Sequence, residues 1–324
     1  MRVLVTGSSG CIGAWTVKQL LERGVDLVCY DQEADFARRD LISGGLSGSA
    51  KLKLEIGKIE DTGRLKALVR DGGITHVIHL AAVLMPCCQA QPVAGGMINV
   101  IGTLNVFEAA RDAGRPVRVV YASSSAVWGP EDAYGDRALS EQDSPLPGTH
   151  YGVFKQANEG NARVFYSASG ISSMGLRPWT VYGVGRDRGL TADPTIAMKA
   201  AVLGVPFQIR LSGYMDLQYV ADVAESFIHC AMSETPGAHV FNLAGTIVEM
   251  NELVTIIDRI SPGAAKLISV GGPQVPVSYR MDGSALEKAV PGIRKTPMEE
   301  GIRRTVAMFS RLRSEGRLSS TLAL

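Results

Sequence analysis

Short apolar runs rich in β-branched residues alternate, along the first half of the chain, with longer stretches in which apolar positions recur every three or four residues. The short runs predict strands and the longer stretches predict amphipathic helices. The predicted strands cover residues 2–6, 27–30, 52–56, 76–80, 117–123 and 172–176. The predicted helices cover residues 14–23, 62–70, 95–113 and 151–169. This alternation is typical of an α/β protein with a doubly wound parallel sheet.

The alternation becomes less regular after Pro178. Helices are predicted there at residues 195–203, 221–233 and 298–313, and strands at residues 207–212 and 239–243. We expect residues 1–178 to form one domain and residues 214–245 to rejoin its sheet. Residues 179–213 and 246–324 would then form a smaller C-terminal lobe.

Composition narrows the class of protein further. The chain has 324 residues, of which 46% are hydrophobic and 20% charged, as in soluble globular proteins. Its 33 basic and 32 acidic residues leave a formal net charge of +1, which argues against nucleic acid or a membrane surface as a partner. No signal segment and no apolar run of membrane-spanning length are expected, so a cytoplasmic location is predicted. The five cysteines form no CxxC pair, and no metal site is predicted.

The stretch TGSSGCIG places Gly7, Gly10 and Gly13 directly after the first predicted strand and at the start of the first helix. The first glycine permits a tight turn, the second lets the backbone approach a pyrophosphate, and the third lets helix and strand pack closely. Free N–H groups at the start of the helix would bind the phosphates. The stretch therefore predicts a dinucleotide site in the first domain.

The choice between NAD and NADP depends on the end of the second strand. Asp31 stands there, eighteen residues after Gly13. A carboxylate at this place accepts hydrogen bonds from the adenosine ribose and repels a 2′-phosphate, which favours NAD. The nearby Arg38 and Arg39 keep NADP open as the alternative.

A second group of residues indicates acid/base chemistry. Tyr151 and Lys155 are four residues apart on a predicted helix, so both project from one face. A neighbouring ammonium lowers the pKa of a phenol by favouring phenolate, and Lys155 would supply that charge. The run YASSSAVWG, residues 121–129, places serine hydroxyls at the carboxyl edge of the sheet, where open α/β folds bind ligands.

With these motifs in this order, the chain resembles the extended short-chain dehydrogenase/reductases, the NAD-dependent epimerase/dehydratase family. The resemblance runs from Met1 to about Phe309 and includes the stretches HLAA, NVIGT, LRPWTVYGVGR and YVADVA. It implies a Rossmann-like sheet, a C-terminal lobe that binds substrate, and NAD as the cofactor. It also implies a homodimer through the helices at 95–113 and 151–169.

The resemblance assigns roles to individual residues. The catalytic residues would be Ser124, Tyr151 and Lys155. Cofactor binding would involve Gly7, Ser9, Gly10, Cys11, Ile12, Gly13, Asp31, Lys58, Ile59, Leu80, Ala81, Ala82, Asn99, Ala122, Ser123, Tyr151, Lys155, Pro178 and Val181. Substrate binding would involve Val83, Ser125, His150, Thr180, Arg186 and Arg188.

Departures from the family pattern concern the substrate. Ser125 and Ala126 stand where dehydratases of nucleotide sugars have Asp-Glu, so dehydration is not expected. Thr180 and Met215 stand where nucleotide-sugar enzymes commonly have the Asn and Arg that hold the diphosphate. A smaller polar or carboxylate-bearing substrate is therefore expected, and residues 83–91 are predicted to form a loop that faces it.

Three functions remain open at this point. The first is an NAD-dependent oxidoreductase that transfers a hydride between the nicotinamide and a secondary alcohol or ketone of a sugar, sugar acid or related polyol. The alternative is a sugar or nucleotide-sugar epimerase that retains NAD. The third is a dinucleotide-sensing regulatory protein, against which the intact Ser124, Tyr151 and Lys155 argue. The first is the main prediction, with a small polyhydroxylated molecule as substrate.

Overall fold

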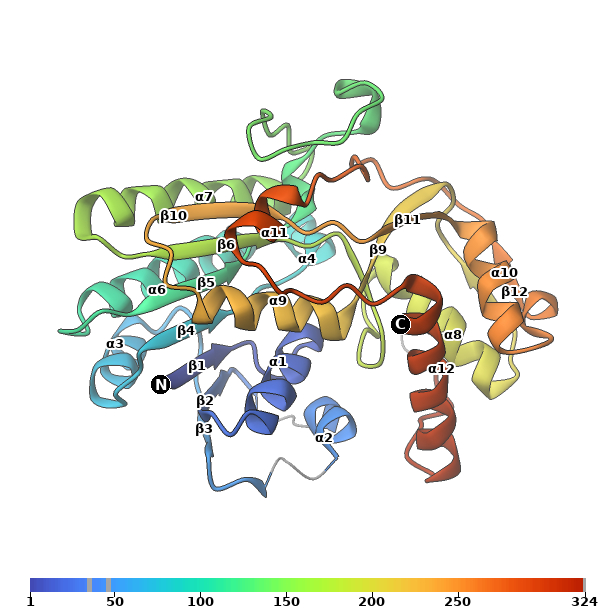
Figure 1. The fold of residues 1–324 in the computed structure, drawn as a ribbon, viewed down its shortest axis with the longest axis horizontal. Coiled ribbons are helices and arrows are strands. Elements are labelled where there is room, and N and C mark those ends of the chain that lie inside the picture. The colour runs from blue at the N-terminus through green and yellow to red at the C-terminus, as the bar shows by residue number, and fades with distance from the viewer. Residues whose placement is uncertain (34–36, 45–47, 323–324) are drawn as a thin grey trace.

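A parallel sheet of seven strands forms the centre of the protein in a computed structural model that describes residues 1–33, 37–44 and 48–322. The strand order is β10-β6-β5-β4-β1-β2-β3 (Figure 1). The strands are β1 (Arg2–Thr6), β2 (Asp26–Asp31), β3 (Leu52–Ile56), β4 (His76–His79), β5 (Arg118–Ala122), β6 (Ser173–Arg177) and β10 (Ala238–Asn242). All six strands predicted in the first half are present, and the predicted α/β fold is confirmed.

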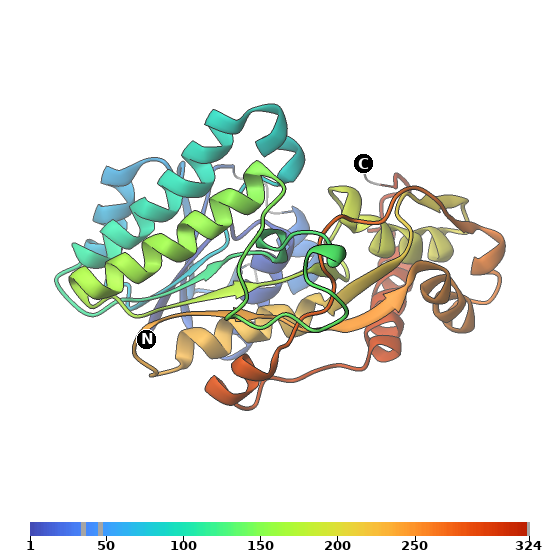
Figure 2. The same cartoon turned by 90° about the horizontal axis from the view of Figure 1, so that it is seen from above.

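Side chains of β1 alternate between two hydrophobic cores on opposite faces of the sheet. Val3 and Val5 belong to one core and Leu4 to the other, as the twofold repeat of a strand requires. Helices α1 (Cys11–Glu22) and α9 (Val220–Met232) cover the first face. Helices α3 (Thr62–Asp71), α6 (Gly102–Arg111) and α7 (His150–Ser169) cover the second face (Figure 2). Burial on both faces explains why these strands read as continuous apolar runs.

Several helices differ from the sequence prediction. The helix predicted at 95–113 is built from α5 (Pro92–Gly96), a π-helical turn (Met97–Ile101) and α6. A short helix, α4 (Met85–Ala90), lies within the segment predicted as a substrate-facing loop. Helix α2 (Ala37–Ser43) was not predicted, because its seven residues are too short for a clear helical period.

The C-terminal part contains two small sheets. One joins β7 (Thr180–Tyr182), β9 (Tyr214–Tyr219) and β11 (Thr246–Glu249), and the other joins β8 (Phe207–Ile209) and β12 (Ile268–Val270). The helices of this part are α8 (Asp193–Leu203), α10 (Met250–Ile260), α11 (Ser284–Ala289) and α12 (Met298–Ser314). Strand β10 returns to the central sheet, whereas β9 pairs with β7 and β11. The division into two functional domains stays a prediction.

One helical run meets the criteria for a membrane span by length and composition. Residues Pro92–Arg111 span 20 residues with a mean hydropathy of 1.3, so the expectation that no apolar run is long enough is wrong. Half of that run is buried inside the fold, and α6 packs against α3. Such burial is the usual condition of a core helix in a globular protein.

Candidate active site

The glycine-rich loop between β1 and α1 is tightly packed. Gly7 has φ +68°, and a Cβ added to it would lie 2.6 Å from the backbone nitrogen of Ala81. A Cβ at Gly13 would lie 2.2 Å from the carbonyl oxygen of Gly7. Helix α1 starts after Gly10, which offers no side-chain cap, so within the described residues the first N–H groups of the helix are available to an anion.

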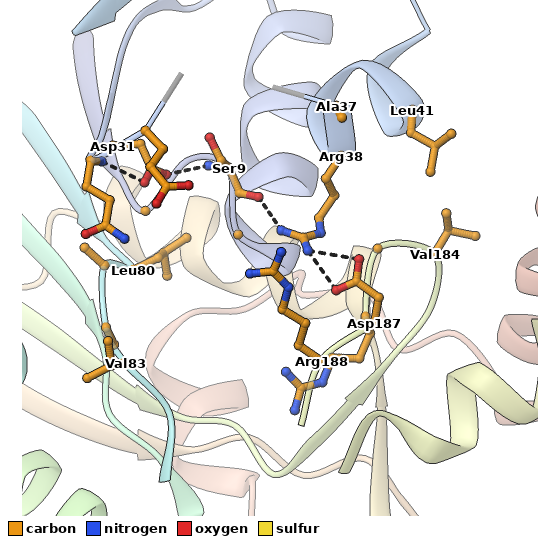
Figure 3. Close-up of a pocket in the computed structure, with 18 of the residues that line it drawn as sticks. Ser9, Asp31, Ala37, Arg38, Leu41, Leu80, Val83, Val184, Asp187 and Arg188 are labelled. Atoms are coloured by element: carbon orange, nitrogen blue, oxygen red, sulfur yellow. Dashed lines mark hydrogen bonds and ion pairs between the residues drawn. The ribbon is translucent and has the colours of Figure 1, made fainter. Parts of the chain in front are cut away.

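Asp31 is held at the end of β2 beside this loop. Its Oδ2 accepts a hydrogen bond of 2.9 Å from the backbone N–H of Ser9, and its Oδ1 accepts one of 2.9 Å from that of Gln32. Asp31 lines a pocket of about 650 Å³ together with Gly7, Ser9 and Gly10 of this loop. Figure 3 shows its carboxylate next to Ser9. The strand end thus places a carboxylate next to the glycine-rich loop, as the sequence predicted.

The pocket collects residues from distant parts of the chain. The predicted residues that line it are Gly7, Ser9, Gly10, Asp31, Ile59, Leu80, Ala81, Ala82, Val83, Arg186 and Arg188. Arg38, which the sequence left as a candidate for an NADP phosphate, also lines it, and further lining residues carried no recognisable sequence signal, among them Asp187, Lys199, Phe309, Arg317 and Leu318. The last three come from α12 and the segment after it, so both ends of the chain contribute to one pocket.

Arg38 connects the glycine-rich loop to the loop after β7. Its guanidinium donates to both carboxylate oxygens of Asp187, at 2.7 and 2.9 Å, and to the carbonyl oxygen of Ser9 at 2.6 Å (Figure 3). Its two terminal nitrogens are therefore already paired within the protein. This pairing argues against Arg38 as a partner for a 2′-phosphate and favours NAD.

The second group of residues forms where the end of β5 meets the start of α7. The side chain of Thr149 caps α7 by accepting a hydrogen bond of 3.1 Å from the N–H of Gly152. Lys155 is 4% exposed, and its Nζ donates to the carbonyl oxygen of Ala122 at 2.6 Å. The same Nζ lies 5.5 Å from the centre of the Tyr151 ring.

Burial sets the acidity of both side chains. It raises the pKa of Tyr151 to about 12, although a hydrogen bond with Ser124 acts in the opposite direction. It lowers the pKa of Lys155 to about 8. The expectation that Lys155 lowers the pKa of Tyr151 is therefore wrong for this structure: removal from water disfavours the charged forms of both side chains, and Lys155 is not among the groups that shift the tyrosine pKa.

A comparison with protein families matches residues 3–244 to the NAD dependent epimerase/dehydratase family. The chain belongs to this family. It is 28% identical over 326 residues to UDP-glucose 4-epimerase of Mycolicibacterium smegmatis, covering 95% of this chain and 98% of that enzyme. It is 29% identical over 290 residues to UDP-glucuronate 4-epimerase 3 of Arabidopsis thaliana, covering 82% of this chain but only 65% of the longer plant enzyme.

Solved structures agree with this assignment. UDP-glucose 4-epimerase of Thermus thermophilus, in complex with NAD, superposes with a TM-score of 0.79 at 27% identity and covers 95% of this chain and 99% of its own. The predicted resemblance to the extended short-chain dehydrogenase/reductases is thus confirmed, and this member of the family is an NAD-dependent enzyme.

The residues present fit NAD. Backbone packs against backbone at Gly7 in the glycine-rich loop and at Gly13 in α1, in the close arrangement that a dinucleotide-binding turn requires. The hydroxyl of Ser9 is buried without a hydrogen-bond partner among the described residues, beside the free start of α1. Asp31 completes the arrangement on the ribose side.

Other predicted residues of this epimerase/dehydratase family member lie outside the pocket lining. Asn99, in the π-helical turn, binds the backbone of Val83 through both amide atoms, at 3.1 and 3.0 Å, and so fixes the segment after β4. His150 is exposed, and its backbone N–H donates to Gln89 at 2.9 Å. The others are Cys11, Ile12, Gly13, Lys58, Ala122, Ser123, Ser124, Ser125, Tyr151, Lys155, Pro178, Thr180 and Val181.

The side chains at the two departures from the nucleotide-sugar pattern are enclosed. Thr180 is 0% exposed and its hydroxyl has no hydrogen-bond partner among the described residues. Met215 is also 0% exposed and belongs to the hydrophobic core. Neither offers a charged group to a diphosphate.

Replacing Asp31 with alanine is expected to narrow the preference for NAD over NADP by at least about tenfold, because the carboxylate no longer repels a 2′-phosphate. Calorimetric titration with both dinucleotides measures the ratio. Asp26→Asn, at the exposed opposite end of β2, is the matched control and should leave the ratio unchanged. A wild-type protein that prefers NADP would contradict the role of Asp31.

Proposed function

We propose that this protein is an NAD-dependent sugar epimerase that oxidises a secondary alcohol and returns the hydride while NAD stays bound. Bound NAD would supply the hydride acceptor. Ser124 would hold the reacting oxygen by a hydrogen bond and Tyr151 would take and return its proton. Lys155 would bind the nicotinamide ribose and provide positive charge beside the tyrosine. The substrate class would be a sugar carried by a nucleoside diphosphate, as the names of the relatives suggest.

The observation that carries the proposal is that the C-terminal segment lines the dinucleotide pocket. Phe309, Arg317 and Leu318 line the pocket together with the glycine-rich loop. Lys199 holds the same segment through a hydrogen bond of 2.6 Å from its Nζ to the carbonyl oxygen of Thr321. A cofactor contacted by residues from both ends of the chain would dissociate slowly, which suits an epimerase better than an enzyme that must exchange NADH at each turnover.

A second candidate is the dehydrogenase predicted first, which would release NADH after oxidising a small polyol or sugar acid. The specific observation in its favour is the enclosed, uncharged pair Thr180 and Met215. A buried diphosphate without a charged partner would bind weakly. Arg186 and Arg188 line the pocket and could contact a smaller anionic group instead.

Two measurements on the purified protein separate these functions. The first is the amount of NAD released on denaturation, where close to one NAD per chain is expected. The second is incubation with UDP-glucose or UDP-glucuronate, followed by NMR analysis of the sugar, where the C4 epimer is expected. A protein free of NAD that produces NADH with polyols or sugar acids, and no epimer, would overturn the epimerase and favour the dehydrogenase.

We further infer a homodimer through the helical run 92–111 and α7. The apolar side chains of Val93, Met97 and Ile101 are 82%, 46% and 37% exposed and recur every four residues, so they form one stripe. Val153 and Val164 of α7 are also exposed. Apolar stripes of this kind mark association surfaces.

Replacing Met97 with glutamate is expected to weaken the dimer at least about tenfold, because the dimer would bury the new charge without a partner. Sedimentation velocity over a concentration series measures the effect. Leu54→Glu, on the exposed face of the edge strand β3, is the control and should leave association unchanged. A wild-type protein that is monomeric throughout would contradict the inference.

A further inference from the structure

The end of β5 and the helix α7 are joined by successive contacts in register. The carbonyl oxygen of Ala122 accepts from Lys155, as described above. One residue further along the chain, the hydroxyl of Ser123 donates to Oε1 of Glu159 at 2.5 Å. Two neighbouring residues at the strand end thus contact two side chains that are four positions apart on the helix.

A third interaction follows the same order. Ser124, the next residue of the chain, interacts with Tyr151 and lowers the pKa of its phenol, against the larger effect of burial. Tyr151, Lys155 and Glu159 recur every four residues and therefore project from one face of α7. The reaction proposed above uses the first two of these and leaves Glu159 without a role.

Glu159 is fixed by a buried ion pair. Arg177 at the end of β6 donates from Nε to Oε1 at 2.8 Å and from one terminal nitrogen to Oε2 at 2.7 Å. The two side chains are 3% and 4% exposed. The guanidinium also lies 4.5 Å from the ring centre of Trp128, and it donates to Asn242 of β10 at 3.4 Å. Arg177 is therefore held from several sides, and it fixes the carboxylate in turn.

We propose that Glu159 is a positioning residue: anchored by Arg177 and Ser123, it keeps Tyr151 and Lys155 in register with the end of β5. Its negative charge also favours the charged form of Lys155. The proposal rests on the proposed function, because Tyr151 and Lys155 are its acid/base pair. Glu159 touches neither the dinucleotide pocket nor the reacting groups and acts through its helix.

Electrostatics agree with this geometry. Burial lowers the pKa of Lys155, and the interactions with Cys88 and with Glu159 act in the opposite direction. The other titratable groups that face Lys155 are Tyr151 on the same helix, Cys88 of α4 and His79 of β4. Burial raises the pKa of the Cys88 thiol and lowers the pKa of the His79 imidazole. Both groups are therefore neutral near pH 7. Among the described groups named here, Glu159 is thus the carboxylate whose charge opposes the effect of burial on Lys155.

The test is the titration of Lys155 in Glu159→Gln. The protein is prepared with lysine labelled with ¹³C at Cε, and the lysine signals are followed by NMR over a pH series. The signal of Lys155 is identified as the one that is absent from Lys155→Arg. Glutamine keeps the size of the side chain but removes the charge, so the pKa of Lys155 is expected to fall by at least about one pH unit. Folded E159Q whose Lys155 titrates as in the wild type would overturn the proposal.

Two further variants make the result decisive. E159Q leaves the buried charge of Arg177 unpaired, whereas E159Q/R177M removes both charges and is expected to fold. Lys155 should titrate below the wild type in the double variant as well, and an unchanged titration there counts against the proposal. Asp193→Asn is the matched control, because it breaks a different ion pair, the one between Asp193 and Arg210. The side chain of Asp193 is 0% exposed, so its carboxylate is as deeply buried as that of Glu159. This control should lower stability and leave the Lys155 titration unchanged.

Turnover separates this proposal from the proposed function. With a UDP-sugar that the wild type converts, E159Q should lower kcat at least about tenfold at pH 7 and change KM less than threefold, since register affects the chemical step. If NAD affinity fell and KM rose by as much as kcat fell, Glu159 would have a merely structural role. A wild type that converts no UDP-sugar would defeat the proposed function, while the NMR titration still decides the role of Glu159.

Discussion

Replacing Tyr151 with phenylalanine is expected to lower turnover at least about 100-fold, which corresponds to about 2.7 kcal/mol of transition-state stabilisation. The substitution removes only the phenolic oxygen, which would move the proton of the reacting alcohol. NAD affinity should stay within about threefold of the wild type, because Tyr151 is not among the residues that line the pocket beside the glycine-rich loop.

The experiment compares turnover with the UDP-sugar or polyol that the wild type converts, beside calorimetry with NAD. Tyr166→Phe is the matched control, since Tyr166 lies on the same helix and is 38% exposed. It should behave as the wild type. Turnover of Tyr151→Phe above about one tenth of the wild-type value would remove Tyr151 from the mechanism.

Replacing Gly13 with alanine is expected to lower NAD affinity at least about 100-fold, or about 2.7 kcal/mol. The new Cβ would lie 2.2 Å from the carbonyl oxygen of Gly7 and 2.9 Å from Cα of Ser8. Atoms do not approach so closely, so the glycine-rich loop or α1 must move. Either movement displaces the free N–H groups that would bind the pyrophosphate.

Calorimetric titration with NAD measures this loss, and circular dichroism shows whether the fold is kept. Gly63→Ala is the control, because Gly63 lies in α3 where the nearest atom to a new Cβ is 3.8 Å away. It should bind NAD normally and be slightly more stable, since alanine is the better helix former. A Gly13→Ala protein that binds NAD within about tenfold of the wild type would show that the close packing is not required.

The stability and the activity of the protein are both expected to depend on the titration of Lys155. The pKa of Lys155 is lowered to about 8, whereas that of an exposed lysine is near 10.5. The folded protein therefore releases this proton at lower pH than the unfolded chain does, so this group destabilises the fold below pH 8 and the destabilisation disappears as pH rises toward 10.5. Activity that needs the ammonium would change in the opposite direction and decline above about pH 8.

The prediction of the fold succeeded where local pattern and global fold agree. The strand around Val3 to Val5 is buried on both faces, so its apolar run is unambiguous. Gly7 and Gly13 could be recognised because only glycine fits where backbones approach so closely. The short helix α4 was missed because six residues around Met85–Ala90 carry too little periodicity.

Some residues of the candidate site could be predicted from the sequence, and others could not. Its adenosine side depends on Asp31 and the glycines, which lie close in sequence and follow a fixed spacing, so the sequence alone determined the cofactor and the family. The order Ser124, Tyr151, Lys155 likewise follows from one strand and the next helix along the chain.

Contacts between distant residues carry no such local signal. The pair Arg38 and Asp187 is separated by 149 residues, and Glu159 meets Arg177 only because α7 packs beside β6. The pKa of Lys155 depends on burial among several elements, which spacing on one helix does not reveal. The sequence thus determined which chemistry the chain carries, because that chemistry rests on short-range motifs. Only the tertiary structure decided which residues line the pocket and how its charges are held, because long-range packing sets both.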